Sequence, residues 1–288
     1  MERHRVDRLV ALIVALLAAL AGYAPTAGAA DPSYVALGDS FTAGPVIPQQ
    51  IPLYGCLKSN NNYPHMAAPD LGQPAFRDAS CSGAETDDMT QPQNVSPDGP
   101  NPPQFDSLDS DTRIVTLGIG GNDIGFSEIG RNCSSPTNSG TPCQDRYVVN
   151  GQDEISARIA ATAPKVAAVL QGIHSRSPLA DVYVVNYLPL LPDTGPGCYP
   201  QMPVTDGDVP YLRAKQKELN QMVADQAAAN TATLVDAYTA GIGRDACQLP
   251  GIRWVEPAVP VNAAAPLHPN LFGMQGTESA LLAAVAAK

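Results

Sequence analysis

The stretch YVALGDSFTAG, residues 34–44, decides the fold, because it joins a strand pattern to a tight turn and a reactive side chain. Its first four residues are apolar or aromatic and Gly38 ends the run, which predicts a short buried strand followed by a turn. Ser40 then stands at the carboxyl end of that strand, at the start of the next helix. Open α/β sheets bind their ligands at such carboxyl ends. The stretch therefore makes Ser40 a candidate nucleophile.

Three further runs of the same kind follow along the chain, at residues 113–119, 181–187 and 233–237. Strands that are apolar throughout fit a parallel sheet that is covered on both faces. Segments with helical periodicity lie between and after these runs: 154–173, interrupted by Pro164; 208–229, with Asp208 as its expected N-cap; and 273–287. The alternation predicts an α/β fold in which a central parallel sheet has helices on both sides.

The first 30 residues have the layout of a secretory signal peptide. Three arginines give a basic start, an apolar run follows from Leu9 to Ala21, and small residues lead up to Ala30. The apolar run is shorter than the roughly 20 residues that span a bilayer, which argues against a membrane anchor. We therefore expect residues 1–30 to be removed, with no stable membrane insertion afterwards, and residues 31–288 to form one domain.

The charge balance narrows the choice of partners. The chain has 288 residues, with 17 Lys and Arg against 28 Asp and Glu, and a formal net charge of −11. Residues 1–30 hold three arginines and two acidic residues, so the remaining 258 residues carry −12. Such a charge repels phosphate backbones and anionic lipid head groups. We expect no nucleic-acid partner, and a neutral substrate fits better.

The six cysteines all lie beyond residue 30, and an even number in a secreted chain predicts disulfides. Six cysteines allow fifteen pairings, among which the residues alone do not choose. No Cys-x-x-Cys pair occurs and no His lies at ligand spacing from a Cys, so we predict no metal and no cofactor. The cysteines fall in segments with little periodicity, 54–82, 131–144 and 196–249, which we expect to be loops, like the Pro-rich segment 89–111.

Three histidines remain as candidate general bases after the leader is removed. His174 follows the predicted helix 154–173, where the helix dipole favours an exposed imidazole. His65 is expected in a loop without informative neighbours. His268 lies in APLHPN, residues 265–270, where two prolines restrict the backbone and can hold an imidazole still. We therefore favour His268 as the base.

Two turns that contain glycine complete the set of candidate residues. GGND, residues 120–123, follows a predicted strand, and Asn122 can present its side-chain amide as a hydrogen-bond donor. CSGA, residues 81–84, contains Gly83, whose backbone N–H is unhindered. Taken alone, each turn is equally typical of an ordinary strand end.

Together and in this order, the four elements resemble the GDSL or SGNH hydrolase family, in its secreted actinobacterial esterase and lipase branch. The family's blocks are a Gly-Asp-Ser nucleophile, a Gly, a Gly-x-Asn-Asp and a His-Pro, which here match Ser40, Gly83, Asn122 and His268. The resemblance implies a flavodoxin-like, three-layer α/β/α fold. It also implies that Ser40 attacks an ester carbonyl and that His268 is the general base. The oxyanion would then be bound by the Ser40 and Gly83 N–H groups and the Asn122 amide.

One departure from the family concerns the group that orients His268. Most members have an Asp three residues before the His, where this chain has Ala265. The resemblance implies that a backbone carbonyl, of Ala265 or Pro266, takes its place, while a distant acid supplied by folding is the alternative. The resemblance further implies three sequential disulfides, Cys56–Cys81, Cys133–Cys143 and Cys198–Cys247.

The expected function is that of a secreted serine ester hydrolase, an esterase or lipase, acting as a monomer on lipid or small-molecule esters, outside the cell or associated with its wall. Two alternatives stay open. One is a carbohydrate esterase that deacetylates polysaccharide or cell-wall glycan. The other is a non-catalytic wall-binding protein on the same scaffold, which the presence of all four block residues disfavours.

Overall fold

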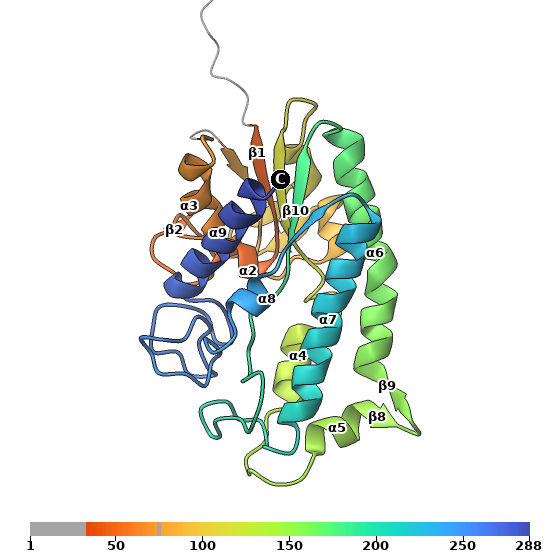
Figure 1. Cartoon of the computed structure of the whole chain (residues 1–288), viewed down its shortest axis with the longest axis vertical. Helices are drawn as coiled ribbons and strands as arrows, with labels where there is room; N and C mark the ends of the chain where they lie inside the picture. The colour runs from red at the N-terminus through yellow and green to blue at the C-terminus, as the bar shows by residue number, and fades with distance from the viewer. Residues whose placement is uncertain (1–32, 74–75) are drawn as a thin grey trace, which may run out of the picture. The chain divides into compact units, whose positions relative to one another are not determined.

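Five parallel strands form the central sheet of the computed structural model, which describes residues 33–73 and 76–288 (Figure 1). In spatial order they are β4 (Phe76–Asp78), β1 (Tyr34–Gly38), β7 (Ile114–Gly118), β10 (Asp181–Val185) and β11 (Thr233–Val235). Numbered along the chain this order is 2-1-3-4-5, which is the flavodoxin-like arrangement. The expected signal peptide, residues 1–30, lies outside the described residues.

Helices cover both faces of this sheet, which confirms the α/β fold with a parallel sheet between two helical layers. One face packs against α6 (Glu154–Arg176) and α7 (Val209–Ala229). The other face packs against α3 (Tyr63–Asp70), α8 (Ala237–Ala240) and α9 (Leu271–Ala286). Three shorter helices are α2 (Ser40–Ala43), α4 (Phe126–Asn132) and α5 (Pro142–Tyr147). No helix in the described part of the chain is long and apolar enough to cross a membrane.

The pleat of β1 explains why its residues are apolar without alternation. Val35 and Leu37 point into the core beneath α6 and α7, while Tyr34 and Ala36 pack against Ala68 of α3 on the opposite face. All four side chains are fully buried. Since successive side chains of a strand point to opposite faces, a strand between two helical layers must be apolar at every position.

Several segments expected to be loops contain short regular elements. Residues 54–82 include a 3-10 turn, η1 (Tyr54–Cys56), as well as β3 (Lys58–Ser59), α3 and β4; residues 89–111 include β5 (Gln93–Val95), β6 (Gly99–Asn101) and η3 (Gln104–Ser107). The remaining short elements are β2 (Gln50–Ile51), η2 (Thr86–Met89), β8 (Val148–Val149) and β9 (Gln152–Asp153). Most of these elements have two to four residues, too few to show a period in the sequence.

His65 lies in α3 and not in a loop, so this expectation was wrong. Asn62 caps the helix by accepting the N–H of His65 at 3.1 Å, and Pro64 lies in the first turn, where proline is favoured. Asp208 precedes α7 as expected but does not cap it. Its carboxylate instead accepts the N–H groups of Cys143 and Gln144 in the first turn of α5.

The carboxyl ends of β1 and β7 approach each other very closely. Gly38 pairs with Gly118, and the N–H of Asp39 donates to the Gly118 carbonyl at 2.9 Å. A Cβ atom on Gly38, whose φ is +152°, would lie 2.4 Å from Thr42 Oγ1 and 2.7 Å from the Gly118 carbonyl oxygen. Glycine is therefore required at position 38 by space as well as by backbone conformation.

Replacing Gly38 by alanine should lower the free energy of unfolding by about 3 kcal/mol or more, because overpacking adds to an unfavourable backbone conformation. Urea denaturation measures this change. Gly72→Ala is the matched control, since Gly72 also has a positive φ (+70°), but no atom of the described residues lies within 4 Å of the added Cβ. Equal losses in the two variants would show that the close approach to β7 does not matter.

Candidate active site

Ser40 and His268, which are 228 positions apart, form a hydrogen bond at the carboxyl end of β1. The Ser40 hydroxyl donates to His268 Nε2 at 2.8 Å. Ser40 is the first residue of α2, and Asp39 caps that helix by accepting the N–H of Phe41 at 2.8 Å. The sheet end and the cap therefore fix the direction in which the Ser40 side chain points.

The backbone carbonyl of Pro266 orients the imidazole of His268. Its oxygen lies 2.7 Å from His268 Nδ1. Because a carbonyl can only accept a hydrogen bond, Nδ1 carries the proton and Nε2 is left free to accept one. The group that orients His268 is thus Pro266, and neither Ala265 nor a distant carboxylate.

Glu256, the last acidic residue before His268 along the chain, supports the loop instead of the imidazole. The N–H of Glu256 donates to the His268 carbonyl at 3.0 Å, and the N–H of Leu267 donates to the Glu256 carbonyl at 3.1 Å. The buried Glu256 carboxylate accepts hydrogen bonds from Asn262 and Asn270, both at 2.7 Å. These contacts hold the backbone on both sides of His268.

Aromatic rings surround the imidazole. The centroid of the Phe41 ring lies 5.3 Å from that of His268, and Phe126 meets the imidazole edge-on at 6.3 Å. Burial lowers the pKa of His268 below its ordinary value of 6.5, and the hydrogen bond to Pro266 opposes this only in part. The imidazole is therefore neutral, and able to accept a proton, at neutral pH.

Asn122 and Gly83 lie on neighbouring loops beside Ser40. The Asn122 amide follows β7 and donates one hydrogen to the Ala84 carbonyl at 2.9 Å, which leaves its second hydrogen available. Gly83 has a φ of +82°, a conformation that favours glycine. Within the described residues, neither the Ser40 nor the Gly83 backbone N–H has an acceptor. Three donor groups are thus free on the turns that follow β1, β4 and β7.

A disulfide and two backbone hydrogen bonds anchor the loop that carries Gly83. Cys81 is bonded to Cys56, and its N–H donates to the Gly38 carbonyl at 3.0 Å. The N–H of Ser82 donates to the Cys56 carbonyl at 2.9 Å. The structure also contains the sequential pairs Cys133–Cys143 and Cys198–Cys247. The first of the three disulfides thus ties the Gly83 loop to the end of β1.

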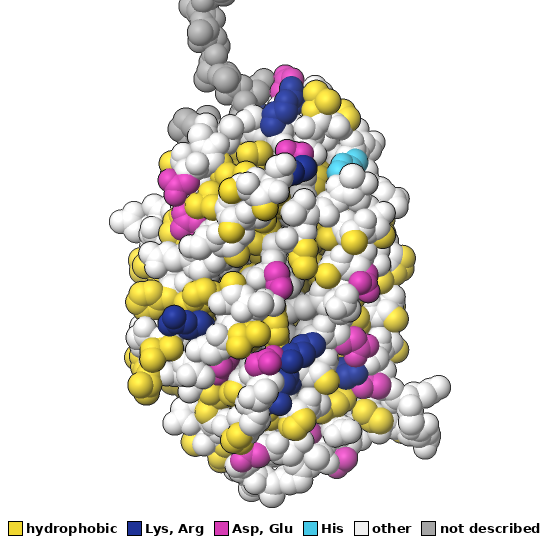
Figure 2. All heavy atoms as spheres, in the orientation of Figure 1, with side chains coloured by type: hydrophobic (Ala, Val, Ile, Leu, Met, Phe, Trp, Pro, Cys, Tyr) yellow, Lys and Arg dark blue, Asp and Glu magenta, His cyan; other side chains and the backbone are white. Residues whose placement is uncertain are grey.

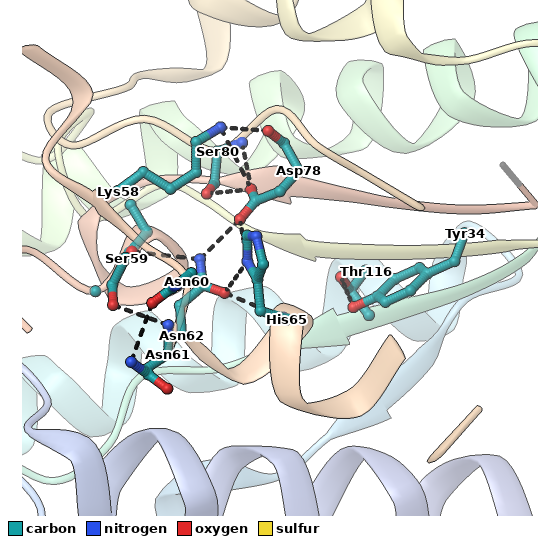
Figure 3. A network of polar contacts seen from close by, with 12 residues as sticks. Tyr34, Lys58, Ser59, Asn60, Asn61, Asn62, His65, Asp78, Ser80 and Thr116 are labelled. Atoms are coloured by element: carbon teal, nitrogen blue, oxygen red, sulfur yellow. Dashed lines mark hydrogen bonds and ion pairs between the residues drawn. The ribbon is translucent and has the colours of Figure 1, made fainter. Parts of the chain in front are cut away.

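Asp78, at the end of β4, organises a polar network just before this loop (Figure 3). Its carboxylate accepts hydrogen bonds from Asn62 at 2.7 Å and Ser80 at 2.5 Å, and lies 3.4 Å from His65 Nδ1. The buried Lys58 ammonium donates to the Asp78 carbonyl. Burial alone would raise the pKa of Asp78, but Lys58 and these hydrogen bonds hold it below the ordinary value. His65 therefore belongs to a structural network and does not contact Ser40.

The third candidate base, His174, is also remote from Ser40. It lies in the last turn of α6, where its Nε2 is 2.9 Å from the carbonyl oxygen of Asn230. Of the three histidines weighed from the sequence, only His268 contacts Ser40, the candidate nucleophile.

Asp39, which precedes Ser40 in the chain, forms a buried pair with Tyr187 that the sequence patterns did not predict. The Tyr187 hydroxyl donates to Asp39 Oδ2 at 2.6 Å and accepts the N–H of Gly121 at 2.7 Å. Burial raises the pKa of Asp39 to about 7. The position of both residues just after a strand was the available signal, since such positions meet at one edge of a parallel sheet. The pair joins the turns that carry Ser40 and Asn122.

An apolar cavity of about 420 Å³ opens beside the Ser40–His268 pair. Asn122 also lines it, whereas Gly83 does not. Most of the remaining wall is apolar and includes the aliphatic side chains of Ile129, Leu191, Met202, Leu212, Leu219 and Leu267, while Arg131, Lys215 and Gln216 are among its polar members. Such a cavity suits an apolar ligand group. The described residues contain no group of three or more His, Cys, Asp or Glu side chains that could hold a metal ion.

Comparison with known proteins identifies the class of hydrolase to which this fold and this site belong. Residues 36–275 match the model of the GDSL-like lipase/acylhydrolase family, and the chain belongs to that family. It is therefore a lipase or esterase, a carboxylic ester hydrolase.

Individual relatives agree with this assignment. The chain is 38% identical to Lipase 2 of Streptomyces coelicolor, over 91% of this chain and 88% of that protein, and 31% identical to Lipase 1 of the same organism, over 96% of each. It superposes on the crystal structure of an extracellular lipase from Streptomyces rimosus with a TM-score of 0.73 and 26% identity, covering 87% of this chain and 98% of the other. A phospholipase A1 from Streptomyces albidoflavus shares the fold, with a TM-score of 0.72, 24% identity, and coverage of 88% and 100%.

Removing the Tyr187 hydroxyl should destabilise the protein by about 1–3 kcal/mol, because Tyr187→Phe leaves the buried Gly121 N–H and one Asp39 oxygen without partners. Urea denaturation followed by circular dichroism gives the change. Tyr54→Phe, which alters an exposed ring, is the control and should leave the midpoint unchanged. A Tyr187→Phe midpoint equal to that of the control would contradict the role of this pair.

Proposed function

We propose that the protein is a secreted ester hydrolase that forms an acyl-enzyme on Ser40, with His268 as general base. The observation that carries the proposal is the 2.8 Å contact between Ser40 Oγ and His268 Nε2. Because the Pro266 carbonyl holds the imidazole proton on Nδ1, Nε2 is the nitrogen that takes the proton from Ser40. The secreted location is supported by the signal-peptide pattern, by the three disulfides and by the likeness to an extracellular lipase.

The reaction proceeds in two halves. Ser40 Oγ attacks the ester carbonyl while His268 Nε2 takes the hydroxyl proton, and the imidazolium then protonates the departing alcohol. A water molecule next attacks the acyl-enzyme while His268 Nε2 takes its proton; the bond between the acyl carbon and Ser40 Oγ then breaks, the acid leaves, and the imidazolium returns the proton to Oγ. The Pro266 carbonyl keeps the imidazole oriented in both halves, although it stabilises the imidazolium less than a carboxylate would.

Negative charge that develops on the carbonyl oxygen needs preorganised donors. The Ser40 and Gly83 N–H groups and the second Asn122 amide hydrogen are free to serve, and loss of one such donor typically costs about 2.7–4 kcal/mol of transition-state stabilisation. The Cys56–Cys81 disulfide and the contacts of residues 81–84 hold two of these donors in place before substrate arrives. Preorganisation of this kind is what lowers the barrier.

The aliphatic cavity favours acyl esters of lipid type over acetylated glycans. A glycan presents hydroxyl groups that require hydrogen-bond partners, and burying them against Leu191, Met202 and Leu212 would leave them unsatisfied. An acyl chain has no such requirement and gains free energy from leaving water. We therefore propose lipid esters as the substrate class.

The Ser40→Ala variant should fold normally but lose at least about 10³-fold in kcat, because no other nucleophile in the described part of the chain contacts His268. The measurement uses chromogenic esters of increasing chain length, and an organophosphonate should label the wild type only at Ser40. Ser127→Ala is the control, since Ser127 lines the same cavity without contacting His268. Undiminished hydrolysis by Ser40→Ala would end the proposal. Cleavage of acetyl esters alone would favour a carbohydrate esterase, and no cleavage at all a binding protein.

The pH profile of kcat/KM should rise from acid to neutral pH, with a midpoint below 6.5. Protonated His268 cannot take the Ser40 proton, and burial lowers its pKa. In Phe126→Ala, water gains access to the imidazole, so the midpoint should move up toward 6.5. Asp39 is the other nearby group that titrates in this range, because burial raises its pKa to about 7. The Asp39→Asn variant separates the two groups: loss of the acid limb of the pH profile in this variant would contradict the assignment of that limb to His268.

A further inference from the structure

The segment of residues 246–277, which leads from α8 into α9, is almost free of charge. It contains only two charged residues, Arg253 and Glu256, and residues 257–277 contain no Asp, Glu, Lys or Arg at all. The whole chain, by contrast, has 45 charged residues among 288, counted as 17 basic and 28 acidic. A surface segment of this length with only two charged residues is unusual for a chain that carries a net charge of −11.

The two charges of the segment are turned inward and face each other. Arg253 Nη2 lies 3.0 Å from Glu256 Oε2, and their side chains are 6% and 0% exposed. The asparagine side chains are also used internally, since the Asn262 amide donates to the Pro250 carbonyl and to Glu256, and the Asn270 amide to the Arg253 carbonyl and to Glu256. The segment therefore offers solvent few charges or hydrogen-bonding side chains.

Large apolar side chains point outward from the same segment. Val259 is 78% exposed, Leu249 71% and Val261 69%. Ile252, Leu271 and Phe272 are exposed as well. Figure 2 shows hydrophobic side chains gathered along the edge of the molecule that the loop before α9 occupies in Figure 1. We call these six side chains the 249–272 surface.

This surface adjoins, along the chain, residues that line the candidate active-site cavity. Ala258, Pro266, Leu267 and His268 line the cavity and belong to the same segment. Val259 directly follows Ala258, and Leu271 begins α9 three residues after His268. An object that rests against the 249–272 surface would therefore meet the chain at the residues that carry the general base.

We propose that the 249–272 surface docks onto an acyl-lipid surface without net charge, so that a lipid ester enters the cavity directly from it. This inference rests on the proposed function and names the form in which the substrate is presented. Apolar side chains that insert among acyl chains leave water, and the two charges of the segment are already buried and paired with each other. The net −11 of the chain opposes an anionic lipid surface but not a neutral or zwitterionic one.

A protein partner fits this surface less well than a lipid. Protein interfaces usually carry about one hydrogen bond per 100–200 Å² of buried area. The amides of Asn262 and Asn270 are already occupied by Glu256 and by backbone carbonyls. A fluid acyl surface requires no such pairing.

The test uses the full-length mature protein with Ser40→Ala, so that binding is measured without turnover. We expect it to co-sediment with phosphatidylcholine vesicles, and the double variant Val259→Asp/Val261→Asp to bind at least tenfold more weakly. Val149→Asp is the control, because Val149 is also exposed, at 57%, but lies on β8 outside the segment. It should bind like the parent.

Turnover separates this inference from the proposed function. With Ser40 intact, the double Asp variant should hydrolyse a soluble short-chain ester like the wild type, since neither valine lines the cavity, but lose activity on an emulsified long-chain ester. Equal vesicle binding by the double variant and the parent would overturn the docking inference, as would stronger binding to anionic vesicles. So would a wild-type dimer that the double variant converts to monomer with unchanged vesicle binding. Absence of any ester hydrolysis, with vesicle binding retained, would instead overturn the proposed function alone.

Discussion

The close parallel pairing of β1 with β7 is the constraint on which the rest of the site depends. Gly38 opposite Gly118 lets the two strand ends approach, and their following turns then begin side by side. Ser40 leaves the first turn and Asn122 the second. A larger residue at Gly38 would separate the strands and, with them, Ser40 from the Asn122 amide. The reactive groups thus lie where the strand order changes direction, which is the usual ligand position in such sheets.

Packing the strand ends this tightly buries polar groups, and the structure satisfies them with side chains from distant segments. Gln104, fully buried, donates to the Gly38 carbonyl and accepts its N–H. Tyr187 bridges Asp39 and the Gly121 N–H. An unsatisfied buried donor lowers the free energy of unfolding, so the contacts that hold the site rigid also stabilise the fold. Around His268, the hydrogen bonds of the buried Glu256 likewise satisfy polar groups and hold the backbone in place.

Local patterns predicted some parts of the molecule and not others. The four apolar runs could be predicted because they are apolar throughout and end in turn residues, and the three long helices because each repeats its pattern over many residues. Strand β4, with the residues Phe-Arg-Asp, could not, because it is short and its partly buried position at the sheet edge does not demand apolar residues. α3 could have been found from Asn62 and Pro64, whose pattern is typical of a helix start. Asp39 stood within the quoted motif, but its burial against Tyr187 depends on a residue 148 positions away.

The sequence by itself determined the class of fold, the candidate residues Ser40, Gly83, Asn122 and His268, and the oxidising compartment that six cysteines suggest, because these follow from local periodicity, motif order and residue chemistry. Only the tertiary structure decided that the Pro266 carbonyl orients His268, that Glu256 turns inward to Arg253, and that Val259 and Val261 face outward beside the cavity. The physical reason is that burial and hydrogen-bond partners are set by contacts between segments far apart in the chain. Such contacts leave no local pattern in the sequence.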